Sequence, residues 1–177
     1  MTRYVALLRG INVGGNRKVP MADLRELATS LELDDVSTYI ASGNLLFSSA
    51  KGEAALTELL HWALEERFGF TIDVVVVSKE HLAEALAGCP FDGDPKQVNV
   101  TFLSTPYDET VREKLQALAA DGERIDFGPT GAKWLYVDFA GGLARSKLAA
   151  KLHAVAKGGY ATTRNIRTVA TLVDLFA

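Results

Sequence analysis

The chain has 177 residues, of which 48% are hydrophobic and 23% charged, and its formal net charge is -3. This length suffices for one large domain or two small ones, and the composition is that of an ordinary globular protein. The negative charge, with a pI of about 5.6, argues against non-specific binding to nucleic acid or to an anionic membrane, because both require a basic surface.

Cysteine content and hydropathy favour the cytoplasm. The chain has one cysteine, Cys89, so it can form neither an intramolecular disulfide nor a cysteine zinc site. The first apolar run is too short for a signal peptide, and no apolar stretch approaches the roughly 20 residues of a membrane-spanning helix. We therefore expect a cytoplasmic protein without a membrane segment.

The first half of the chain alternates strand and helix signals. Short β-branched and aliphatic runs predict strands, and apolar residues at helical spacing predict helices. In chain order, the expected elements are a strand at 3–9, a helix beginning at Pro20, strands at 36–42 and 45–49, a helix over 56–68 and a strand at 71–78. This βαββαβ order is that of the split βαβ, or ferredoxin-like, fold.

The second half repeats that order after a connecting helix at 80–87. The expected elements are a strand at 98–103, a helix over 111–119, strands at 124–127 and 134–139, a helix over 148–156, a strand at 160–163 and a closing helix over 169–176. We predict an α+β chain of two tandem ferredoxin-like (βαββαβ) units joined by a helix, with an extra C-terminal helix. The boundaries are 1–78 for the first unit, 79–96 for the connecting helix and linker, and 97–177 for the second unit with the C-terminal helix.

A glycine-rich loop, RGINVGG at residues 9–15, follows the first predicted strand. It does not fit the phosphate-binding P-loop, since Asn16 and Arg17 stand where lysine and serine or threonine belong, and the dinucleotide pattern G-x-G-x-x-G is absent. Two interpretations stay open. Gly14 and Gly15 supply positive φ angles for a long loop, or the loop binds a ligand, as long loops often do.

In a split βαβ unit, this loop and the hairpin between the second and third strands lie at one end of the sheet. The hairpin reads SGN at residues 42–44, for which a tight turn is the simplest role. The candidate binding residues at this end of the sheet are Arg9, Gly10, Asn12, Gly14, Gly15, Lys18, Ser42 and Asn44.

A second polar cluster is expected in the second unit. Ser146 is a candidate N-cap flanked by Arg145 and Lys147, and the last strand of the unit ends in Arg164 and Asn165, predicted at the same end of the sheet. Three cations at one helix start repel unless an anion lies among them, which favours a phosphate or carboxylate ligand. The other interpretation is a set of solvated charges around a helix cap.

Trp134 and Tyr136 alternate with Leu135 and Val137 along one predicted strand. If the two aromatic rings face away from the helices of their unit, they form either a packing surface for a sheet or a second protomer, or a platform for a nucleic-acid base. Packing is favoured, because the RNA-recognition motif pattern is missing and the chain is acidic.

Three segments, YVALLRGINVGGNRKVPMADLREL, VSTYIASGNLLF and RSKL followed later by TTRN, resemble the bacterial family catalogued as domain of unknown function 1697. The resemblance extends over essentially the whole chain and implies two α+β subdomains in tandem, without an established activity. Near the end the family pattern is similar to R-N-W-N-T-V, whereas this chain has Ile166 and Arg167 in place of the tryptophan and the second asparagine.

The leading functional hypothesis is binding of a small anionic or phosphorylated ligand, or a nucleotide, through these glycine- and cation-rich loops. The alternatives are a module that binds protein or single-stranded nucleic acid, and an enzyme acting on a phosphorylated substrate. The sequence assigns no catalytic residue, no metal ligands and no cofactor, and a homodimer is compatible with it.

Overall fold

The computed structural model describes residues 1–155 and 158–177. The chain divides into two units, Met1–His81 with Phe176, and Leu82–Leu175 with Ala177. Each unit contains a four-stranded antiparallel sheet, so the chain is of the α+β class, with six α-helices among its described residues. None of those helices combines the length and the apolar character needed to cross a membrane.

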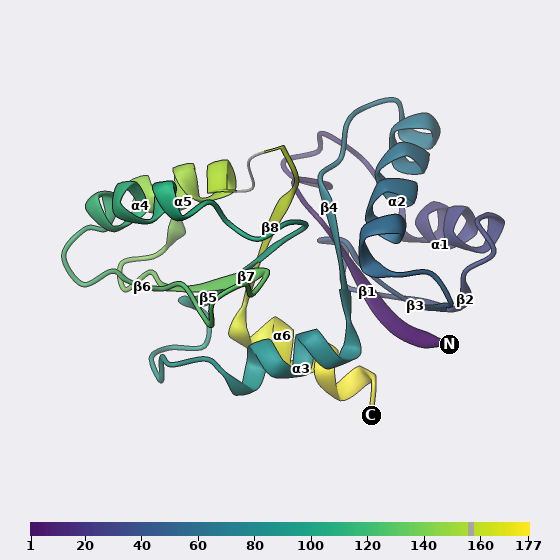
Figure 1. Ribbon diagram of the computed structural model, residues 1–177. Helices are drawn as coiled ribbons and strands as arrows, with labels where there is room; N and C mark the ends of the chain where they lie inside the picture. Colours follow the sequence, from purple (N-terminus) through teal and green to yellow (C-terminus); the bar gives the residue numbers. More distant parts are fainter. Residues whose placement is uncertain (156–157) are drawn as a thin grey trace. The chain divides into compact units, whose positions relative to one another are not determined.

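The first unit carries its helices on one face of its sheet. Its elements are β1 (Thr2–Leu8), α1 (Met21–Ser30), β2 (Asp34–Tyr39), β3 (Asn44–Ser49), α2 (Glu53–Phe68) and β4 (Val74–Ser78). The strand order is β2-β3-β1-β4, and Figure 1 shows α1 and α2 on the same side of these strands.

Alternation along β1 explains this packing, because successive side chains of a strand point to opposite faces. Tyr4, Ala6 and Leu8 join the core that includes Leu24 of α1 and Leu60 of α2. The register of β1 pairs Leu7 with Asn44, and Leu8 with Val74. The end of β1 and the starts of β3 and β4 therefore meet at one end of the sheet, where the glycine-rich loop leaves it.

The second unit repeats the order of elements. They are α3 (Lys79–Ala87), which begins in the first unit, then β5 (Val98–Leu103), α4 (Arg112–Leu118), β6 (Arg124–Asp126), β7 (Trp134–Asp138), α5 (Lys147–Lys151), β8 (Ala161–Asn165) and α6 (Ile166–Leu175). The strand order, β6-β7-β5-β8, corresponds to that of the first sheet.

The predicted helix at 148–156 differs from the observed one. The observed segment is α-helical only over Lys147–Lys151 and continues as a 3₁₀ turn over Leu152–Val155. Position 156 lies outside the described residues. Leu148 and Leu152 are both buried in the core of the unit, so the apolar spacing marks the buried face without specifying which helical hydrogen bonds follow.

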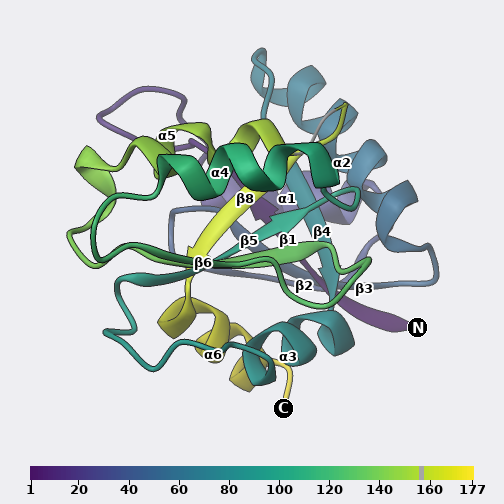
Figure 2. The same ribbon diagram turned by 60° about the vertical axis from the view of Figure 1, so that its left-hand side comes forward.

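The aromatic face of the second sheet is covered. Figure 2 shows α4 and α5 on one face of this sheet and α3 and α6 on the other. Trp134 Nε1 donates a hydrogen bond to the Tyr136 hydroxyl at 3.0 Å, and that hydroxyl donates to the Ala85 carbonyl of α3 at 2.7 Å. Burial raises the pKa of Tyr136 to about 12. These rings therefore pack beneath a helix, and the alternative of an open base-binding platform is wrong.

Candidate functional site

The glycine-rich loop is a miniature hairpin. The Asn12 amide donates to the Arg17 carbonyl at 3.0 Å, and the Asn16 amide donates to the Val13 carbonyl at 3.0 Å. Gly14 and Gly15 lie between them with φ of 58° and 78°, the pair of positive angles that a type I′ turn requires. The interpretation that these glycines supply positive φ is confirmed.

The Asn12 side chain holds this hairpin to the rest of the unit. Its Nδ2 donates to the Val19 carbonyl at 3.0 Å and to the Ala41 carbonyl at 2.8 Å, while its Oδ1 accepts from the Val19 amide at 2.8 Å. The sequence suggests that Asn12 contacts a ligand. In the structure its side-chain amide instead fixes the position of the loop, and both of its N–H donors are used within the protein.

The predicted closeness of the loop and the SGN turn is confirmed. The Leu8 amide donates to the Gly43 carbonyl at 2.9 Å, and Ala41 receives the bond from Asn12 described above. Asn44 is fully buried, and its Nδ2 donates to the Tyr39 carbonyl at 2.9 Å and to Ser42 Oγ at 3.5 Å. Ser42 and Asn44 close the hairpin between β2 and β3, as the simpler of the two interpretations predicts.

Arg17 is the most firmly positioned cation of the loop. Its Nε donates to the Gly10 carbonyl and its Nη2 to the Thr71 carbonyl, each at 2.7 Å, and its guanidinium lies 4.7 Å from the centre of the Phe70 ring. Both hydrogen-bond partners are neutral carbonyls, so neither neutralises the charge. These contacts thus position the guanidinium, and none of these three partners is a carboxylate.

Arg9 and Asp73 complete the site from the neighbouring strand ends. The Arg9 amide donates to the Asp73 carbonyl at 2.9 Å, and the side chains form an ion pair with 3.4 Å between Nη1 and Oδ2. Together with the loop they border an open hollow of about 660 Å³, here called the arginine hollow. It is lined by Arg9, Gly10, Val13, Asn16, Arg17, Thr71 and Asp73.

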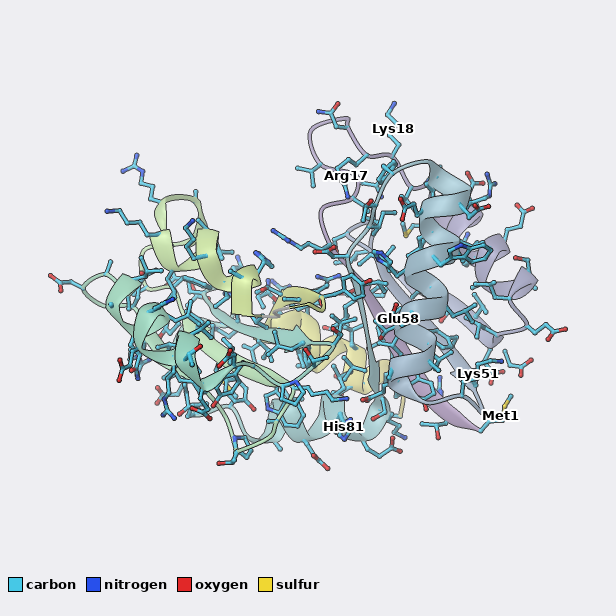
Figure 3. The ribbon with its side chains drawn as sticks, turned by 45° about the horizontal axis from the view of Figure 1, so that its top comes forward. Met1, Arg17, Lys18, Lys51, Glu58 and His81 are labelled. Carbon is cyan, nitrogen blue, oxygen red and sulfur yellow. The ribbon has the colours of Figure 1, made fainter. Side chains whose placement is uncertain are left out.

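The structure thus changes the membership of the first cluster. Of the predicted residues, Arg9 and Gly10 line the hollow, whereas Lys18 is not among its lining residues and projects outward beside the loop (Figure 3). Arg17 and Asp73 are the functional candidates that sequence reasoning missed. The sequence contains one signal for Arg17, namely that it stands where the P-loop motif has serine or threonine.

The second cluster has its own anion. Ser146 is the N-cap of α5, as predicted, since its Oγ accepts from the Ala149 amide at 3.1 Å. The same hydroxyl donates to Glu123 Oε2 at 2.6 Å. A carboxylate of the protein therefore stands at the helix start where the sequence had suggested a bound ligand, and Arg145 and Lys147 are exposed beside it.

Replacement of Ser146 tests this structural role. We expect Ser146→Ala to lower the free energy of unfolding by about 1–2 kcal/mol, because it removes a helix cap and a charge-assisted hydrogen bond. The neighbouring exposed variant Lys147→Ala serves as control and should stay within about 0.5 kcal/mol of wild type. Urea unfolding measures both, and equal losses in the two variants would contradict the role assigned to the cap.

Arg164 lies on the other face of the second sheet. Val100 of β5 pairs with Arg164 on one side and with Tyr136 on the other. Directly paired residues share a face of the sheet, so Arg164 and Tyr136 lie on the face that α3 covers. Burial lowers its pKa to about 10. Asn165 caps α6 through its Oδ1, which accepts from the Thr168 amide at 2.8 Å. The predicted gathering of Arg164 with Ser146 is therefore wrong, because Arg164 lies an odd number of residues along β8 from Ala161, whose side chain packs in the core with Leu148 of α5.

Cysteine and metal-ligand chemistry give no second candidate among the described residues. Cys89 is half-buried, burial raises the pKa of its thiol, and its Sγ lies 3.7 Å from the Phe91 carbonyl. Within residues 1–155 and 158–177, no three His, Cys, Asp or Glu side chains are grouped to hold a metal ion. The arginine hollow is therefore the strongest candidate site.

Comparison with known proteins identifies the family. Residues 1–131 match the family described as Protein of unknown function (DUF1697), and the chain belongs to it. The conserved bacterial protein SP0830 from Streptococcus pneumoniae is similar in structure, with 29% sequence identity, a TM-score of 0.78 and 99% of each chain covered. No curated protein matches significantly. The arginine hollow lies wholly within the matched segment, and Arg145, Ser146 and Lys147 lie outside it.

Proposed function

We propose that this member of the DUF1697 family binds a small anion, a phosphate or carboxylate group, in the arginine hollow. The observation that carries the proposal is the placement of Arg17, whose guanidinium is held at the hollow by two neutral carbonyls and the Phe70 ring. A guanidinium fixed before binding loses little conformational entropy when an anion docks against it.

Arg9 adds a second guanidinium from the end of β1. Its side chain is 42% exposed, and its contact with Asp73 at 3.4 Å is longer than a strong charge-assisted hydrogen bond. An anion can therefore compete with Asp73 for part of the Arg9 fork. Two guanidinium groups at one concave surface offer the paired donors that phosphate and carboxylate oxygens accept.

The frame of the site is the first βαββαβ unit, which we propose to be a ferredoxin-like unit repeated in the second half. The Asn12 and Gly43 contacts keep the loop beside the sheet end. The proposed compartment is the cytoplasm, on the same compositional argument as before.

Substitution of the two arginines tests the proposal. We expect Arg9→Gln and Arg17→Ala each to weaken binding of inorganic phosphate about tenfold or more, because a hydrogen bond to a charged group contributes about 1.5–3 kcal/mol. Isothermal titration calorimetry at low salt measures the affinity, and the thermal midpoint of each variant verifies that it is folded.

Lys18→Ala is the matched control, since it removes one cation from the same loop without touching the hollow. Its affinity should stay within about twofold of wild type. If the Lys18 variant loses as much affinity as the arginine variants, binding depends on the general charge of the loop and not on the hollow. If the wild-type protein binds neither phosphate nor any phosphate ester, the proposal is wrong.

A further inference from the structure

Asp73 is an unexpected group in an anion site, because a carboxylate repels a bare phosphate. The side chain nevertheless lines the arginine hollow beside Arg9, and its place is fixed by the backbone hydrogen bond from the Arg9 amide to the Asp73 carbonyl at 2.9 Å. Glu65, which accepts a hydrogen bond from the Thr71 hydroxyl at 3.4 Å, is not among the residues that line the hollow. The hollow itself therefore combines two arginines with one carboxylate that accepts hydrogen bonds.

Such a combination suits a ligand that carries both an anionic group and hydroxyl groups. Asp73 accepts hydrogen bonds from hydroxyls, and the exposed side-chain amide of Asn16 both donates and accepts. Val13 adds an aliphatic surface with 62% of its area exposed, against which the C–H groups of a carbohydrate can pack. The guanidinium groups of Arg9 and Arg17 can then donate hydrogen bonds to the phosphate oxygens.

The same lining is less suited to a nucleotide. Protein sites for bases commonly stack them on an aromatic ring. The seven residues that border the hollow include no aromatic side chain, and the nearby Phe70 ring is already covered by the Arg17 guanidinium at 4.7 Å. A saturated polyhydroxyl body matches the lining better than a flat base does.

We infer that the ligand of the arginine hollow is a small phosphorylated polyol or sugar, with the phosphate on Arg9 and Arg17 and a hydroxyl group donating to Asp73. This inference rests on the proposed anion-binding function and narrows it to one class of ligand. It makes Asp73 the residue that distinguishes a sugar phosphate from phosphate alone.

Calorimetry with five probes tests the inference on the full chain. The probes are inorganic phosphate, glycerol 3-phosphate, ribose 5-phosphate, glucose 6-phosphate and AMP. We expect at least one of the three polyol phosphates to bind about tenfold more tightly than inorganic phosphate and more tightly than AMP, since about 1.4 kcal/mol corresponds to tenfold. In Asp73→Asn, this advantage should fall to about twofold or less, while inorganic phosphate binds as well as before or better.

Asp23→Asn is the matched control, because Asp23 is also a surface carboxylate paired with an arginine, Arg67, at 4.0 Å, but lies on α1 outside the hollow. It should keep the full advantage of the polyol phosphate. If inorganic phosphate binds but no polyol phosphate binds more tightly, or if AMP binds most tightly, the inference is wrong and the proposed anion site stands. If Asp73→Asn keeps the advantage, Asp73 does not select the ligand and the inference is likewise wrong.

Discussion

Replacing Gly43 by alanine should destabilise the protein more than any other single methyl addition in the site region. A Cβ atom at this position would lie 2.8 Å from the Leu8 Cβ and 2.9 Å from the Ile11 Cδ1, and the backbone φ is +95°. Both neighbours are buried, so neither can move aside easily. Overpacking together with backbone strain predicts a loss of about 2–4 kcal/mol in the free energy of unfolding.

Urea unfolding of Gly43→Ala measures this loss, and Gly14→Ala is its control. Gly14 also has a positive φ, of 58°, but a Cβ there meets no atom within 4 Å. The control therefore isolates the cost of the left-handed backbone, about 1 kcal/mol. Similar losses in the two variants would show that backbone conformation alone, and not the close approach of β1 to the hairpin, requires glycine at position 43.

Replacing Asn12 by aspartate should release the glycine-rich loop. The substitution keeps the shape but places an oxygen where Nδ2 now donates to the carbonyls of Val19 and Ala41. Two hydrogen bonds are lost and a carboxylate faces two carbonyl oxygens, so we expect the free energy of unfolding to fall by about 2–3 kcal/mol. Because Arg17 follows in the same hairpin, we expect phosphate affinity to fall as well.

The comparison for Asn12→Asp is Asn16→Ala, measured by urea unfolding. Asn16 is an exposed asparagine of the same hairpin. In Asn16→Ala, the free energy of unfolding of the protein should change by no more than about 0.5 kcal/mol. Amide hydrogen exchange of residues 10–19 should accelerate in Asn12→Asp alone, and unchanged exchange would contradict the anchoring role of that amide.

The strands and helices follow closely from apolar periodicity. The interval 98–103 was predicted to the residue, and β1, α1 and β4 differ from their predicted ranges only at the ends. Burial explains this agreement, because the period of the apolar residues decides whether a strand or a helix places them all on one buried face. The exception at α5 arises because α and 3₁₀ turns bury Leu148 and Leu152 on the same side.

Polar residues were harder to assign, because their partners lie far away in the sequence. The Arg17 guanidinium depends on a carbonyl 54 residues later, and Ser146 is bonded to a carboxylate 23 residues earlier. Neither partner has a local signal. Because the sequence does not show that Glu123 lies beside Ser146, the nearby cations implied a bound anion. Because it does not show that Thr71 lies beside Arg17, that arginine counted only as a mismatch to the P-loop motif.

The sequence by itself determined the two βαββαβ orders and, through them, the closeness of the loop and the SGN turn, since these follow from strand order. For Gly14 and Gly15 it left the turn role and the ligand-binding role both open, and the structure shows the turn. Only the tertiary structure decided which cations share a hollow. Strand register placed Arg9 beside Asp73, and the Thr71 carbonyl accepted the hydrogen bond that positions Arg17 at the hollow. The register of β8 placed Arg164 on the face opposite α5. A side chain's direction depends on contacts between distant segments, which periodicity along the chain does not encode.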